Sequence, residues 1–163
     1  MRLAIKIAAF FSFYALLTAC AWTVQATDPL YPLYQKFLQA SRSDDIEILQ
    51  DNLLSSRVSA LWHESKEASL DEFSPIFKHV SSLTGKEHSH FYAITGETAC
   101  LSVNLITDNA AAVAINTGFV LEKGGWKVDD VMLDLLQSEQ DFVIKATCPL
   151  SAEDFLLQAE QSF

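Results

Sequence analysis

The sequence predicts an α+β fold in which N-terminal helices pack on a curved antiparallel sheet, followed by a helical appendage at the C-terminus. Apolar residues recur at helical spacing over 28–84, and short runs rich in β-branched and aromatic residues follow over 91–133. A helix-capping sequence comes after Cys148-Pro149. Half of the residues are apolar, as in a globular protein, so we expect one α+β domain over 27–163, with its core over 30–133 and an extension over 134–163.

An export signal is predicted over residues 1–26. Arg2 and Lys6 form a short cationic start, and the apolar run that follows is shorter than the ~20 residues that a membrane-spanning helix needs. Two cleavage sites are open. Leu-Thr-Ala-Cys before Cys20 resembles the lipobox of bacterial lipoproteins, and Val-Gln-Ala ending at Ala26 resembles an ordinary signal-peptidase site. Cleavage before Cys20 is favoured because the apolar run ends directly beside it.

The two cleavage sites imply different locations. By resemblance to Gram-negative lipoproteins, a lipidated Cys20 followed by Ala21 implies an anchor on the periplasmic face of the outer membrane. Cleavage after Ala26 implies a protein that is soluble in the periplasm or secreted. Apart from the lipid on Cys20 in the first case, no contact with the membrane is expected.

The charge of the chain argues against nucleic acid as a partner. The chain has 21 Asp and Glu against 11 Lys and Arg; two of the basic residues lie in the signal, which leaves a net charge of −12 for the rest. Binding to nucleic acid needs clustered cations that displace counterions from phosphates. There is also no glycine-rich phosphate loop, and we expect no cofactor.

Two of the three cysteines are left with a thiol after either cleavage, because Cys20 is then lipidated or removed. Cys100 and Cys148 would then lie in an oxidising compartment, where a pair of thiols is expected to form a disulfide. Neither belongs to a CxxC pair, which argues against a metal or redox site.

Three helical stretches are expected before the sheet. The first begins at Asp28-Pro29, a typical pair for an N-cap and a first helical position. The second covers 46–62, where Ser55-Ser56 can divide it. The third begins either at the capping box Ser69–Glu72 or at Ser74-Pro75.

Four strands are expected, over residues 91–95, 98–106, 111–122 and 126–133. A three-residue loop over 107–109 is favoured between the second and third strands, because it gathers the apolar residues of both on one face. The residues that it aligns are Leu101, Val103 and Leu105 with Ile115, Val113 and Ala111. Gly124-Gly125 is the expected turn before the last strand, and it pairs Phe119 with Asp130.

The C-terminal extension has two parts. Residues 134–147 fit a helix or a strand, and both alternatives stay open. Ser151–Asp154 forms a second capping box, which predicts a final helix to Phe163.

This order of elements resembles the nuclear-transport-factor-two-like superfamily, a cone-shaped α+β fold. The resemblance covers about residues 30–133 and rests on the helices, the antiparallel meander and the last strand, with its Gly-Gly-Trp-Lys-Val-Asp-Asp-Val segment. It implies that the curved sheet and the helices enclose a pocket. Some members use this pocket for isomerase or dehydratase chemistry, and others use it for binding or assembly, so the fold alone does not select a function.

Asp130 is the candidate catalytic residue. In the predicted register it shares an apolar pocket whose lining residues are Phe119, Trp126, Val128, Asp130 and Met132. A carboxylate there loses contact with water, so its pKa rises towards that of a useful acid or base. Ketosteroid-isomerase-like members of the superfamily place inward acids in such a pocket. The alternative is that Asp130 reaches water or caps a backbone group.

His88 and His90 alternate along the sequence and are expected to point to one side of a strand. Two imidazoles can bind zinc, but a stable site needs three or four ligands, and no further ligand follows at a fixed spacing. We expect no metal site at these weak candidates.

The function expected from these features is that of an exported, outer-membrane-anchored binding or scaffold domain without catalysis. Its partner would be a small apolar ligand or an envelope protein. One alternative is an isomerase or hydro-lyase that uses Asp130, and another is a structural component of an envelope assembly.

Overall fold

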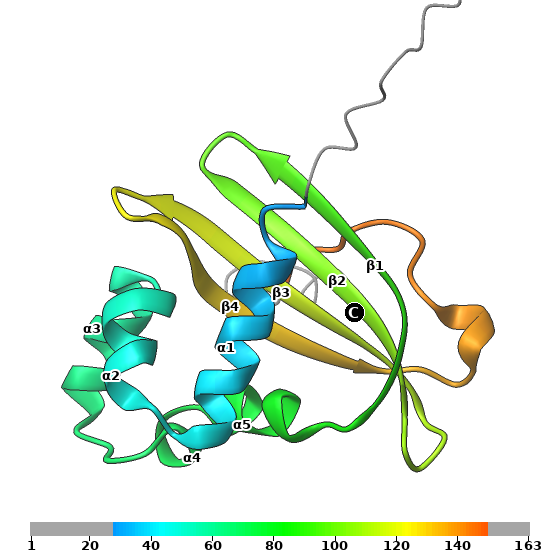
Figure 1. The fold of residues 1–163 in the computed structure, drawn as a ribbon, viewed down its shortest axis with the longest axis horizontal. Helices are drawn as coiled ribbons and strands as arrows, with labels where there is room; N and C mark the ends of the chain where they lie inside the picture. Colours follow the sequence, from blue (N-terminus) through cyan, green and yellow to red (C-terminus); the bar gives the residue numbers. More distant parts are fainter. Residues whose placement is uncertain (1–27, 150–163) are drawn as a thin grey trace, which may run out of the picture.

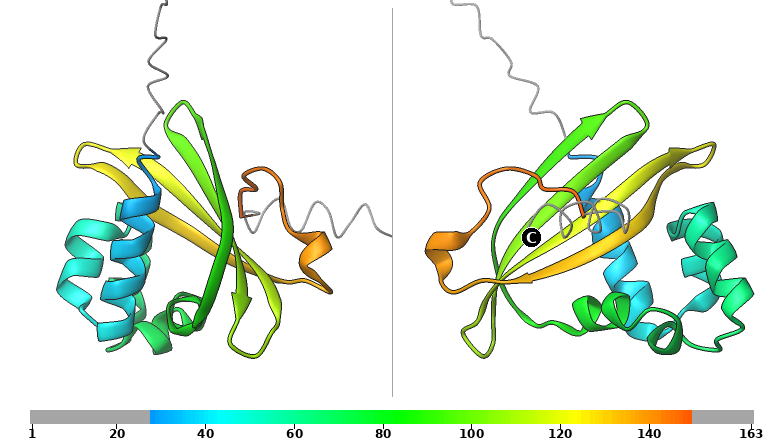
Figure 2. Two further views of the ribbon diagram at one scale, coloured as in Figure 1. Left: turned by 45° about the vertical axis from the view of Figure 1, so that its right-hand side comes forward. Right: turned by 180° about the vertical axis from the view of Figure 1, so that it is seen from behind.

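The computed structural model describes residues 28–149, which form a four-stranded antiparallel sheet with helices on one face. The strands follow one another in the order β1-β2-β3-β4. Figure 1 shows the helices in front of the sheet, and Figure 2 shows that the segment after the last strand crosses the opposite face. The predicted α+β class is confirmed, with N-terminal helices on a curved antiparallel sheet. The predicted final helix lies outside the described residues.

The helical layer contains α1 (Tyr31–Ser43), α2 (Ile46–Ile48), the π-helical turn η1 (Leu49–Leu53), α3 (Ser56–Ser65), α4 (Leu70–Phe73) and α5 (Pro75–Ser82). No helix in this described part of the chain is long and apolar enough to cross a membrane.

Polar side chains lie at the starts of these helices, although α1 begins at Tyr31, two residues later than the predicted first helical position Pro29. The carboxylate of Asp28 accepts hydrogen bonds from the backbone N–H groups of Leu30 (2.8 Å) and Tyr31 (3.2 Å), at the start of α1. The break at Ser55 is confirmed, because its hydroxyl accepts from Val58 N–H and caps α3. Both alternatives for the third stretch occur. The Ser69 cap starts α4, and Pro75 starts α5 directly afterwards.

The sheet consists of β1 (Gly85–Thr95), β2 (Thr98–Thr107), β3 (Ala112–Glu122) and β4 (Gly125–Leu135). Strand β1 begins earlier than expected, at Gly85, whose backbone has a φ of +155°. A Cβ at this position would lie 2.2 Å from the carbonyl oxygen of Ile106. Only glycine allows the two strands to approach so closely here.

The core lies between the helices and the sheet. Its largest fully buried side chains include Trp62, Tyr34, Phe37 and Phe119. The Phe37 ring packs edge to face on Phe77, with 5.4 Å between ring centres, and joins α1 to α5. The Trp62 ring stacks on Phe73, with 5.1 Å between ring centres, and joins α3 to α4.

The β2–β3 register keeps the predicted faces but differs by two residues. Val103 pairs with Ile115, where the sequence predicted Val113. The loop is three residues long, as expected, but it covers 108–110, with Ala110 at a φ of +60°. A slip of two residues leaves each side chain on the same face, so the apolar face is unchanged.

The β3–β4 register also differs from the predicted one, and this difference places Asp130 on the other face of the sheet. The turn consists of Lys123 and Gly124, one residue earlier than the predicted Gly124-Gly125, because Glu122 pairs with Gly125. Phe119 then pairs with Val128. A β-bulge then leaves Asp129 as an extra residue, so Asp130 pairs with Gly118. The prediction that Asp130 lies opposite Phe119 is therefore wrong.

A second bulge interrupts β1. Glu87 pairs with Leu105 and Ser89 pairs with Asn104, which leaves His88 as the extra residue. His88 and His90 consequently lie on opposite faces of the sheet, against the prediction. His88 contacts Phe142 on the face away from the helices, whereas His90 lies on the helical side.

The segment after β4, here called the strap (residues 136–149), is neither of the predicted alternatives. Apart from the short 3-10 turn η2 (Glu139–Asp141), it contains no helix or strand. It is held to the sheet by the side chain of Asn104, which donates to the carbonyl of Val143 (2.8 Å) and accepts from its N–H (3.2 Å). The amide of Asn104 thus replaces the backbone of a neighbouring strand.

Two further contacts hold the end of the strap. The Ser102 hydroxyl accepts from Thr147 N–H (2.8 Å) and donates to the side chain of Asn116 (2.5 Å). Cys100 and Cys148 form a disulfide, with their Cα atoms 5.1 Å apart. Because Ser102, Asn104 and Asn116 are fully buried, these hydrogen bonds satisfy groups that water does not reach.

Candidate functional site

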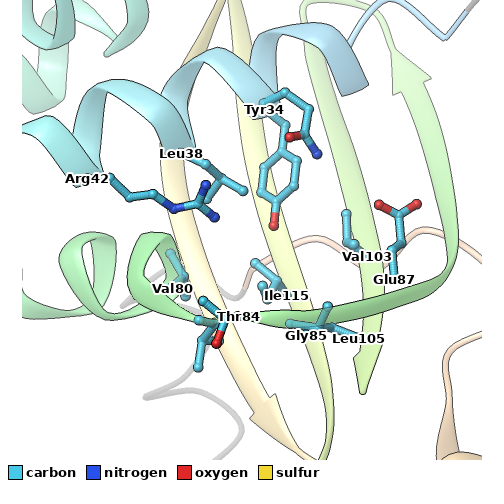
Figure 3. Close-up of a pocket in the computed structure, with 12 residues that line it drawn as sticks. Tyr34, Leu38, Arg42, Val80, Thr84, Gly85, Glu87, Val103, Leu105 and Ile115 are labelled. Carbon is cyan, nitrogen blue, oxygen red and sulfur yellow. The ribbon is translucent and has the colours of Figure 1, made fainter. Parts of the chain in front are cut away.

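A cavity of about 460 Å³ lies between α1, α5 and the sheet (Figure 3). Such a volume is within the range of small-molecule sites. Its lining residues are Tyr34, Gln35, Leu38, Arg42, Val80, Leu83, Thr84, Gly85, Glu87, Val103, Leu105 and Ile115.

Helix α1 supplies one wall. Tyr34, Leu38 and Arg42 are spaced four residues apart, so they lie along one side of the helix. The sheet supplies an apolar floor through Val103, Leu105 and Ile115. The floor favours an apolar ligand, and the polar groups lie around it (Figure 3).

The Tyr34 ring is buried and forms one polar group of the cavity. No described residue makes a hydrogen bond with the Tyr34 hydroxyl. Its oxygen is not among the fully buried polar atoms without a partner, so it is not completely shielded from solvent. Burial raises the pKa of Tyr34, and the charges of Glu87 and Tyr31 raise it further, whereas Arg42 opposes the shift. The phenol therefore stays protonated and can donate a hydrogen bond to a ligand.

Arg42 stands on the side of the cavity opposite Glu87 (Figure 3). Its Nε donates to the carbonyl of Ser81, which joins the end of α1 to α5 and fixes the guanidinium. In the described range no residue accepts a hydrogen bond from its two Nη atoms. The nearby carboxylate of Asp44 is already paired with Lys78, at 2.8 Å.

Glu87 gives the other side of the cavity a negative charge. Its Oε2 accepts a hydrogen bond from the Tyr31 hydroxyl, and its Oε1 lies 2.7 Å from Nδ1 of His90. The His90 ring stacks on the Tyr31 ring, with 4.2 Å between ring centres. Its Nε2 lies 3.6 Å from the carboxylate of Asp28. Burial, followed by the hydrogen bond to Glu87, raises the pKa of Tyr31 to about 12. Both oxygens of Glu87 thus have partners, and the one to Tyr31 joins α1 to β1.

This arrangement is suited to binding. No histidine or cysteine lines the cavity, and its single carboxylate is hydrogen-bonded on both oxygens. Three side chains that line the cavity have unused hydrogen-bonding capacity among the described residues: the Tyr34 hydroxyl and the Arg42 guanidinium, which can donate, and the Gln35 amide, which can donate and accept.

The five residues of the predicted pocket do not come together in this cavity. Phe119, Trp126 and Val128 lie on the face that the helices cover, whereas Asp130 and Met132 lie on the face that the strap crosses. Phe119 and Asp130 both border a separate, open hollow of about 700 Å³ near Arg57. Trp126 borders a third hollow beside α1 and η1.

Asp130 has the raised pKa that its sequence context suggested, but in a different place. Loss of contact with water raises the pKa of its carboxyl, and the N–H of Val131, which donates to Oδ1 at 2.8 Å, and the charge of Arg57 partly offset this shift. Its neighbours are Gly118 and the ring of Pro149, next to the disulfide.

The two histidines do not form a joint site, since the bulge separates them. In the part of the chain that the structure describes, no three His, Cys, Asp or Glu side chains are grouped so that they could bind a metal ion.

Sequence reasoning missed Arg42 and Glu87. Tyr34 and Leu38 belong to the apolar stripe of α1, and Arg42 continues that stripe four residues later. An exposed cation that continues the apolar stripe of an amphipathic helix was the signal available. Glu87 had no such signal, because the bulge beside it determines its direction.

Comparison with known proteins gives a structural likeness but no match of sequence. No protein-family model matches the sequence, and no curated protein matches it either. The structure is similar to the crystal structure of a candidate dehydratase of the NTF2-like family from Streptomyces avermitilis, with 13% identity and a TM-score of 0.45. The match covers 67% of this chain and 95% of the other. The function is therefore argued from the geometry of this chain alone.

Proposed function

We propose that this protein is an exported, non-catalytic binding protein that holds a small apolar ligand in the cavity between α1 and the sheet. The single observation that carries the proposal is a cavity of about 460 Å³ with an apolar floor and two unused hydrogen-bond donors, those of Tyr34 and Arg42. A cavity that is mostly apolar, with a few polar groups at fixed places, is typical of small-molecule sites.

Export forms part of the same proposal. The signal-like residues 1–26 support it, as does the disulfide between Cys100 and Cys148, because disulfides persist in oxidising compartments. Lipidation at Cys20 would hold the binding domain on the periplasmic face of the outer membrane. A binding protein there could shield an apolar molecule from the water of the periplasm.

The proposal is tested with neutral apolar probes. Nile red should bind the purified protein with one saturable site, and 1-decanol should displace it. Leu105→Trp should abolish this binding. Leu105 is a partly exposed residue of the floor, and the larger indole side chain would fill the cavity.

The matched control is Ile94→Trp. Ile94 is an aliphatic strand residue too, but it is 45% exposed and does not line the cavity. Its variant should bind Nile red as the parent does. Absence of saturable binding, or equal binding by both variants, would contradict the proposed function.

A further inference from the structure

We infer that the ligand is a monocarboxylate, an apolar acid whose carboxylate binds Arg42 and the hydroxyl of Tyr34. This inference rests on the proposed function and adds the chemical class of the ligand. It follows from how charge is distributed around the cavity.

The first step concerns the guanidinium. Arg42 and Arg57 are the two arginines of the described range, and Arg57 is paired with Asp129 at 3.0 Å. Arg42 has no such carboxylate there, and its Nε bond to Ser81 leaves both Nη atoms available. A role limited to joining α1 and α5 needs only Nε. A guanidinium with free Nη atoms beside an apolar cavity has the geometry that binds a carboxylate through two parallel hydrogen bonds.

The second step concerns Tyr34. Its hydroxyl enters the same cavity from the same side of α1, two turns before Arg42, and it is a protonated donor without a protein partner in the described range. Together the two side chains offer donors to an anion and no acceptor other than the phenol oxygen.

The third step concerns the opposite side. Glu87 keeps its negative charge near the cavity while Tyr31 and His90 occupy its oxygens. A ligand group that reaches Glu87 therefore meets negative charge on a carboxylate whose two oxygens already have hydrogen-bond partners. This favours an apolar end over a second carboxylate.

The experiment compares three molecules with the same ten-carbon chain as competitors of Nile red on the unmodified protein. Decanoate should bind at least tenfold more tightly than 1-decanol, because it adds charge-assisted hydrogen bonds to Arg42. Decanedioate should bind at least tenfold more weakly than decanoate, because its second carboxylate faces Glu87.

Variants place the effect at Arg42. Arg42→Gln should remove the preference for decanoate over 1-decanol, whereas Arg42→Lys should keep part of the preference. Lys36→Gln is the control, because it removes the same charge from an exposed position on the same helix outside the cavity, and it should keep the preference.

The outcomes separate the two proposals. Equal binding of decanoate and 1-decanol by the unmodified protein overturns the carboxylate assignment and leaves the binding function standing. A preference that survives in Arg42→Gln, shown to be folded by its melting curve, overturns it as well. If neither Nile red nor any competitor binds, the proposed function itself fails.

Discussion

The bulge at Asp129 determines the environment of Asp130. Without the extra residue, Asp130 would pair with Thr117 and point into the core; with it, Asp130 pairs with Gly118 and lies beneath Pro149. Asp129 itself is held by the Ser55 hydroxyl at 2.5 Å and by Arg57 at 3.0 Å. The extra residue Asp129 thus moves Asp130 from a position inside the core to a half-buried position on the opposite face of the sheet.

Asp130→Asn should make the protein slightly more stable at neutral pH. The pKa of Asp130 is raised in the folded protein above its ordinary value of 3.8, so the unfolded chain loses this proton first and stability falls as the pH rises. This cost is absent below the ordinary pKa and complete above the raised one. Asn keeps the acceptor for Val131 N–H, and after screening by water we expect a gain below about 1 kcal/mol.

Chemical denaturation of both proteins at pH 3 and pH 7 checks this prediction. The two should be equally stable at pH 3 and should differ at pH 7. A variant that is less stable at pH 7 would mean that the Asp130 charge has a partner which stabilises it.

At the scale of elements, α3 is attached to the bulge of β4 through Ser55. The Ser55 side chain is fully buried, caps α3 and donates to Asp129, while its backbone N–H donates to the carbonyl of Val128 at 2.8 Å. A helix cap and a contact between layers therefore depend on the same hydroxyl.

Ser55→Ala should lower the free energy of unfolding by about 1–2 kcal/mol, because the cap is lost and Asp129 loses a donor. Ser56→Ala is the matched control. Its exposed hydroxyl donates to Glu122 at 2.8 Å, and its loss should cost less than about 0.5 kcal/mol. Urea unfolding curves measure both, and equal losses would contradict the role given to Ser55.

The strap is the other element whose attachment can be measured. Changing both Cys100 and Cys148 to Ser should lower stability by about 4 kcal/mol, since the disulfide closes a loop with a sequence separation of 48. The hydrogen bonds from Asn104 to Val143 should hold the strap more weakly once the disulfide is gone.

Hydrogen exchange of Val143 N–H should then speed up more than exchange of the core strands, because the strap opens by itself. Unchanged exchange at Val143 would show that the hydrogen bonds alone keep the strap closed.

At the scale of the whole molecule, the helices and the strap cover opposite faces of one sheet (Figure 2). The ligand cavity belongs to the helical side, and the buried polar groups Ser102, Asn104 and Asn116 belong to the strap side. Binding and the disulfide are therefore separated by the sheet, and reduction of the disulfide should alter binding only through overall stability.

The predicted lipid anchor also concerns the whole chain. We expect the mature protein to begin at an acylated Cys20, so Cys20→Ala should release it from the membrane fraction or block its processing. Intact-mass measurement of protein extracted from membranes checks this. A soluble protein that begins at Thr27 would contradict lipidation and leave export in place.

The sequence by itself determined the class of fold, the caps of α3 and α4 and the apolar faces of β2 and β3. These depend on neighbours along the chain: Ser55 and Ser69 cap their own helices, and alternation in a strand survives the two-residue slip of β2 against β3. The disulfide between Cys100 and Cys148 followed from the cysteine count and the predicted export signal.

Only the tertiary structure decided the site. The bulges at His88 and Asp129 reverse the faces of the residues that follow, and nothing in local spacing indicates them, because a bulge forms where contacts from other elements, such as Ser55 and Arg57 on Asp129, stabilise the extra residue. The cavity has the same origin. Tyr34, Arg42 and Glu87 come from a helix and a strand that are distant in sequence, and they surround one space only because α1 packs across the curved sheet.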